Sequence, residues 1–130
     1  MYLLDTDTLI FLSKGQLDIQ EKIEKVGISQ CVMSEISLFE LYVGIYKSNS
    51  SKLRSSVEFL ERNFTSVPIS SAKESYARMR AGLERRGAVL DSMDLLIAAT
   101  ALEKDYTLVS HNARHFSRIP DLKLEDWIEE

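Results

Sequence analysis

The sequence has little cysteine and histidine, and it has no long apolar run. Cys31 is the only cysteine among 130 residues, so the chain cannot form an internal disulfide. We expect a small buried thiol in a reducing compartment. No stretch approaches the ~20 apolar residues that a transmembrane helix needs. Because Met1 leads directly into an apolar segment without a basic signal region, we expect a cytoplasmic protein without a membrane partner.

An excess of basic residues is also missing. The chain has 16 Lys and Arg against 20 Asp and Glu, for a formal net charge of -4. No global basic field therefore attracts nucleic acid, and a phosphate-bearing substrate would have to be bound locally or through a metal. A composition of 45% hydrophobic and 28% charged residues fits one globular domain over residues 1–130.

Short apolar runs alternate with amphipathic segments along the chain. This alternation predicts the α/β class, with a mostly parallel central sheet of about four or five strands and helices on both faces. Segment 35–47 is apolar on nearly every side, which predicts a buried helix. We expect strands at residues 2–4, 31–33, 67–69, 107–110 and 122–124, and helices at 8–12, 17–26, 35–47, 53–64, 70–87 and 91–104.

Four polar residues lie just after a predicted strand or in a helix next to one: Asp5, Glu40, Asp94 and Asn112. Parallel strands point their carboxyl ends to one edge of the sheet, so these side chains can converge there. Three neighbouring carboxylates repel one another unless a cation neutralises them. Oxygen ligands favour a hard ion, so the pattern predicts a Mg²⁺ or Mn²⁺ site.

Each of these residues also has a purely structural explanation. Asp5 or Asp7 can cap the following helix, and Asp91 is interpreted as an N-cap. Asp94 falls in a first helical turn, where the helix dipole favours an acid. Asn112 can simply begin a turn. Glu40 is harder to explain structurally, because an interior charge between two apolar neighbours has no evident partner in the sequence.

Four segments together resemble a known family. They are residues 3–7 (LLDTD), 34–41 (SEISLFEL), 94–102 (DLLIAATAL) and 108–112 (LVSHN) with Phe116. In this order and spacing they resemble the PIN domain, and more narrowly the VapC-type toxins of bacterial toxin–antitoxin systems, including the closing segment 122–127. The resemblance implies a metal-dependent endoribonuclease that cleaves tRNA, rRNA or mRNA, is inhibited by an antitoxin of the VapB type, and forms a homodimer.

The resemblance also implies roles for individual residues. Asp5, Glu40 and Asp94 match the acidic metal-binding triad, and Asn112 falls where many members place a fourth acid or an Asn. Thr6 matches a hydroxyl position beside the first acid, which implies that it orients a metal-bound water. Two residues depart from the family pattern and bear on the outer coordination. Asp7 stands where relatives often have Asn or Ser, and His115 stands where several carry an acid.

These assignments suggest a mechanism for phosphodiester hydrolysis. In this hypothesis Asp5 and Asp94 hold a Mg²⁺ that activates water, and Glu40 positions or deprotonates that water. A second ion about 4 Å away would stabilise the leaving oxygen. Arg114 and Arg118 follow the fourth predicted strand and are the preferred phosphate contacts. His111 and His115 are interpreted as turn residues rather than general acids.

A partner surface can also be predicted. Two apolar stripes, at residues 39–46 and 53–60, could form a groove for an antitoxin helix. The alternative function is a catalytically weak PIN-like binding module that acts on DNA or RNA mainly through its antitoxin complex. Magnesium-dependent RNA degradation by the isolated protein would separate this alternative from the nuclease.

Overall fold

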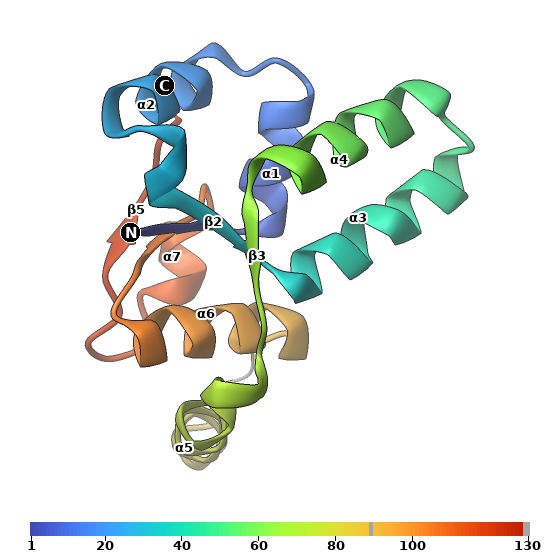
Figure 1. Ribbon diagram of the computed structural model, residues 1–130. Helices are drawn as coiled ribbons and strands as arrows, with labels where there is room; N and C mark the ends of the chain where they lie inside the picture. The colour runs from blue at the N-terminus through green and yellow to red at the C-terminus, as the bar shows by residue number, and fades with distance from the viewer. Residues whose placement is uncertain (89, 129–130) are drawn as a thin grey trace.

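The computed structural model describes residues 1–88 and 90–128, which form a parallel sheet with helices on both faces (Figure 1). The strand order is β3-β2-β1-β4-β5, and every neighbouring pair is parallel, as predicted. Edge strand β3 lies at Thr65–Val67 and not at residues 67–69 as predicted, because the chain leaves the sheet before Pro68, which has no N–H to donate. The strands are β1 (Tyr2–Leu4), β2 (Cys31–Ser34), β3 (Thr65–Val67), β4 (Thr107–Val109) and β5 (Leu124–Glu125).

The helices follow the predicted order with small changes at their ends. The segment that begins at Ser70 starts as a 3₁₀ turn, and its α-helix runs only from Lys73 to Arg85. No helix within the described ranges has the length and apolar character that crossing a membrane requires. The helices are α1 (Thr6–Ser13), α2 (Leu17–Val26), η1 (Ile28–Gln30), α3 (Glu35–Ser48), α4 (Ser51–Asn63), η2 (Ser70–Ala72), α5 (Lys73–Arg85), α6 (Ser92–Lys104) and α7 (Ala113–Phe116).

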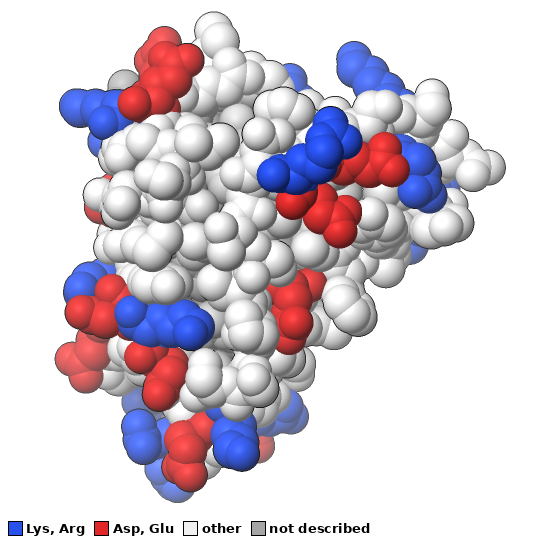
Figure 2. All heavy atoms as spheres, in the orientation of Figure 1, with Lys and Arg blue, Asp and Glu red and all other residues white. Residues whose placement is uncertain are grey.

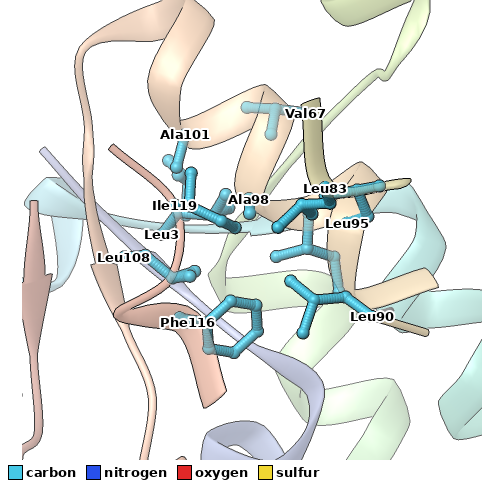
Figure 3. Packing of buried hydrophobic residues seen from close by; sticks show 12 residues of the cluster. Leu3, Val67, Leu83, Leu90, Leu95, Ala98, Ala101, Leu108, Phe116 and Ile119 are labelled. Carbon is cyan, nitrogen blue, oxygen red and sulfur yellow. The ribbon is translucent and has the colours of Figure 1, made fainter. Parts of the chain in front are cut away.

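Alternating residues of the strands pack into two separate cores. Leu3 and Leu108 face the core beneath α5, α6 and α7 (Figure 3), whereas Leu4 and Val109 face the core beneath α1 to α4. This alternation is the period of two expected of a strand covered on both faces. Cys31 is buried in the second core, as predicted for a small buried thiol, and its burial raises the thiol pKa to about 11.

Helix α3 corrects one prediction, because it is not buried on every side. Leu41 and Ile45 face the core, but Phe39, Val43 and Tyr46 are 72%, 54% and 73% exposed. In Figure 1, α3 and α4 form a hairpin that projects from the side of the sheet, so the fold covers only one side of α3. The spacing of the three exposed residues places them on one helical face, which we call the α3 stripe.

The order of the strands determines where a site can form. The chain moves from the central strand β1 outward to β2 and β3, and then returns to β4 on the opposite side of β1. The point where the strand order reverses in this way leaves a crevice at the carboxyl ends of the strands, here β1 and β4. The backbone N–H of Asp5 donates to the carbonyl of Val109 at 3.0 Å, which holds these two strand ends together.

Candidate active site

Asp5 lies at the carboxyl end of β1 and caps α1. Its Oδ1 accepts a hydrogen bond of 2.9 Å from the backbone N–H of Thr8, so the capping interpretation is correct. The side chain is also 4% exposed, and this burial raises its pKa. Hydrogen bonds from Ser110 and Thr8 oppose the shift because they stabilise the charged carboxylate. Asp5 therefore combines a structural role with a buried carboxylate at the strand edge.

Glu40 has the partner that its sequence position did not reveal. The Thr6 hydroxyl donates to Oε1 of Glu40 at 2.6 Å, and the Thr6 and Ser37 hydroxyl oxygens are 2.9 Å apart. Thr6 begins α1 and Glu40 lies in the middle of α3, so this contact joins the helices that follow β1 and β2. The carboxylate of Glu40 is thereby held at the same edge of the sheet as Asp5.

Asp94 lies in the first turn of α6, after the N-cap Asp91. Its pKa is raised to about 6, chiefly because the carboxyl group is partly buried. The negative charges of Asp91, Asp5 and Glu40 raise the pKa further, and the neighbouring His115 lowers it. The charges of Asp5 and Glu40 therefore act on Asp94 at this edge of the sheet.

His115 lies next to Asp94. Its Nε2 is 3.5 Å from Oδ2 of Asp94, and its ring meets the buried ring of Phe116 edge to face. His115 is partly exposed, as the sequence suggested, but it lies in the short helix α7 rather than in a turn. His111 contacts a different acid: its Nδ1 lies 2.9 Å from Oδ2 of Asp126.

The remaining predicted site residues are exposed. Asn112 is exposed before α7, where its backbone N–H donates to the Ser110 hydroxyl, and its side chain makes no capping bond. Asp7 is exposed, and its charge contributes to the raised pKa of Asp5. Arg114 and Arg118 are exposed as well. These positions are compatible with contacts to a bound substrate rather than with the buried part of the site.

Sequence reasoning missed the hydroxyl groups that surround the acids. Ser37 and Ser110 are both fully buried, and each bonds to the site through a side-chain oxygen. The sequence contained a signal for each of these two serines. Ser37 precedes Glu40 by one helical turn and so shares its face, and Ser110 directly follows β4. Serine is common at turns and caps, so neither position stood out.

The donors at the site are carboxylate and hydroxyl oxygens, which suit a hard divalent ion. In residues 1–88 and 90–128, no three His, Cys, Asp or Glu side chains form a preformed metal cluster. Mg²⁺ is usually held by only one or two carboxylates, with waters and substrate phosphate as further ligands. The mutually repelling carboxyl groups at Asp5 and Asp94 fit such an ion. The joint assignment of Asp5, Glu40 and Asp94 as ligands stays a prediction.

The apolar groove of the molecule lies away from the carboxylates and differs from the one predicted. Val57 and Leu60 belong to the core, so residues 53–60 do not form an open groove with the α3 stripe. A groove of about 540 Å³ lies instead between α1, α2 and α4, and its lining includes Leu12, Ile23 and Phe59.

Figure 2 shows acidic and basic side chains side by side over α4 and α5, without a continuous basic strip on that face.

Comparison with known proteins identifies the family. The PIN domain model matches residues 2–122. The chain is 34% identical to ribonuclease VapC2 of Rickettsia felis, with 98% of each chain covered. It is 30% identical to the tRNA(fMet)-specific endonuclease VapC of Salmonella typhimurium, with 97% of each covered.

Solved structures agree with the sequence comparison. VapBC2 from Rickettsia felis, bound to a DNA fragment from its promoter, matches with a TM-score of 0.87 and 28% identity, and 98% of each chain is covered. DNA-bound VapBC from Salmonella typhimurium matches with a TM-score of 0.86 and 30% identity, again over 98% of each chain. The protein therefore belongs to the PIN-domain family, and its relatives include the VapC ribonucleases.

Proposed function

We propose that this protein is an endoribonuclease toxin that hydrolyses RNA phosphodiester bonds with the help of Mg²⁺ or Mn²⁺. The observation that carries the proposal is the electrostatic conflict at Asp94, whose pKa is raised by burial and by the charges of Asp91, Asp5 and Glu40. A fold gains no stability from gathering like charges, so such a cluster favours a functional explanation. Full-length similarity to VapC ribonucleases supports the same activity.

The proposed roles follow from the position of each carboxylate. Asp5 and Asp94 would hold the divalent ion, because one is fixed by the end of β1 and the other by the first turn of α6. When bound, such an ion supplies Lewis-acid activation of water and of the phosphoryl group. Glu40 would orient the attacking water or take its proton, since its Oε1 is held by Thr6 and its other oxygen remains for a second contact.

Substrate binding would rely on local contacts, because the net charge is negative. Arg114 is exposed at the start of α7, one position before His115, and is the preferred contact to a phosphate. Asn112, which is exposed just before α7, would contact the substrate or its associated waters. We propose RNA of the tRNA, rRNA or mRNA class as the substrate, in keeping with the ribonuclease names of the relatives.

Protein partners are part of the proposal. The solved relatives are complexes of VapC with VapB, so we expect this chain to bind an antitoxin of the VapB type. The groove between α1, α2 and α4 offers that partner an apolar surface away from the charged site. The α3 stripe is a second exposed apolar surface, which we assign to an isologous contact between two copies.

The experiment measures RNA cleavage by the purified chain with Mg²⁺, with Mn²⁺ and with EDTA. Asp5→Asn keeps the size of the side chain and an oxygen that can accept from Thr8, so the cap at α1 is retained while the charge is removed. We expect cleavage with either metal and none with EDTA or in Asp5→Asn. Undiminished cleavage by the variant would refute the proposed site.

The same experiment tests the alternative function. A PIN-like binding module would bind an antitoxin and would leave RNA intact with either metal. Intact RNA together with normal antitoxin binding would therefore favour that reading over the nuclease.

A further inference from the structure

A chain of two hydroxyl groups leads from the interior of the protein to the carboxylate of Glu40. Ser37 is fully buried and Thr6 is half-buried. Oγ of Ser37 lies 2.9 Å from Oγ1 of Thr6, within hydrogen-bond distance. Thr6 then contacts Oε1 of Glu40 at 2.6 Å. Ser37 and Glu40 are one turn apart on α3, whereas Thr6 reaches them from the start of α1.

The number of protons determines the direction of this chain. A threonine hydroxyl has one proton to donate, and a carboxylate can only accept. Thr6 therefore gives its proton to Glu40, so its oxygen must accept the proton of Ser37. The order is Ser37 to Thr6 to Glu40, and each bond polarises the next, because a hydroxyl that accepts a hydrogen bond becomes a stronger donor.

Alternative roles for Ser37 are not supported by its position. It does not cap α3, because Ser34 is the N-cap and accepts from the backbone N–H of Ile36. Its hydroxyl is buried with Thr6 as its hydrogen-bond partner, so it needs that contact to avoid the cost of an unpaired polar group. An alanine at this position would serve packing equally well, which leaves the contact to Thr6 as the reason for a hydroxyl.

We infer that Ser37 and Thr6 are positioning residues that hold the Glu40 carboxylate in its working orientation. This inference rests on the proposed nuclease function of the same site. Neither hydroxyl has to touch RNA: Ser37 acts through Thr6, and Thr6 acts through Glu40. Partners of this kind behind a catalytic carboxylate typically contribute 10–100-fold to activity or metal affinity.

The test uses the full-length chain with Ser37→Ala, Thr6→Val and the double variant. We expect Ser37→Ala to lower kcat about 10-fold and Thr6→Val about 100-fold, with KM for RNA nearly unchanged. The double variant should match Thr6→Val, because removal of Thr6 already disconnects Ser37. Ser37→Thr keeps the hydroxyl and should restore most of the activity. If the fold-losses of kcat in the two single variants multiply in the double variant, the two residues act independently and the inference is wrong.

Ser75 provides a matched control. It is also a buried helical serine, and its hydroxyl donates to Oε2 of Glu103 at 2.7 Å, outside the site. Ser75→Ala should lose as much thermal stability as Ser37→Ala but no activity. An equal loss of activity in the two variants would mean that Ser37 acts only on folding and would refute the inference.

A measurement without metal or RNA separates this inference from the proposed function. Urea unfolding of the metal-free single and double variants gives the coupling between Ser37 and Thr6. If the double variant loses less stability than the sum of the two singles, the contact exists whether or not the protein cleaves RNA. Additive losses of the free energy of unfolding would refute the inference even if the protein cleaves RNA. Absence of cleavage by the wild type would instead refute the proposed function.

Discussion

Helix α6 has an aspartate at each end, and their surroundings are opposite. Asp94, in the first turn, is partly buried near three other acids, and its pKa is raised to about 6. Asp105, the C-cap, is exposed and lies 2.8 Å from Nζ of Lys123, and its pKa is lowered. The chain thus pairs the exposed acid at the C-terminal end of α6 with a lysine. At the carboxyl edge of the sheet it gathers acids instead, which indicates selection for something other than stability.

The largest expected effect is on catalysis. Asp94→Asn should lower the rate of RNA cleavage at least about 100-fold, because it removes a proposed metal ligand. Asp105→Asn makes the same chemical change at the other end of α6 and should leave the rate unchanged. Initial rates on a labelled RNA check both variants. Equal rates for the two would remove the functional distinction between the ends of the helix.

Metal binding should produce the next largest effect. An ion that binds only the folded state at 100 times its dissociation constant adds about 2.7 kcal/mol to the free energy of unfolding. We expect Mn²⁺ to raise the melting temperature of the wild type and of Asp105→Asn, but not of Asp94→Asn. A thermal melt with and without Mn²⁺ measures this. A shift that survives in Asp94→Asn would place the ion elsewhere.

The pH dependence of stability should have opposite signs at the two ends. The folded protein holds the proton of Asp94 more tightly than the unfolded chain, whose pKa is near 3.8. Metal-free stability should therefore fall as the pH rises from about 4 to 6 and remain low above that range.

The size of this effect is limited by solvent, because the side chain of Asp94 is 34% exposed. After allowance for screening we expect a loss of about 1–2 kcal/mol. Urea unfolding between pH 4 and 7 measures it, and Asp94→Asn should flatten the curve. Asp105 acts in the other direction, since its lowered pKa stabilises the fold above pH 4 and this contribution is lost in acid. A wild-type free energy of unfolding that rises as the pH increases through 6 would contradict the raised pKa of Asp94.

The smallest effect is expected at the exposed ion pair. Lys123→Ala removes the partner of Asp105, but both side chains are more than half exposed. Such pairs contribute little in water. The melting temperature should stay within error of the wild type, at low and at high salt. A clear loss would show that the pair at this end of α6 is structural after all.

Part of the fold could be read from the sequence because its signals are local. The apolar run before Asp5 predicted a buried strand, and Asp91 was interpreted as an N-cap; the structure confirms both. Caps and periodicity depend on residues within one turn or one strand. The exposure of α3 could not be read this way, because an apolar helix does not reveal which side the rest of the fold will cover.

The sequence alone determined which acids follow which strands, and therefore that Asp5, Glu40 and Asp94 would be candidates for one site. Only the tertiary structure decided what surrounds them. Thr6 meets Glu40 across 34 positions of chain, and His115 of α7 meets Asp94 of α6. Contacts of this kind depend on the order of the strands and on the packing of helices from distant parts of the chain, which no local pattern records.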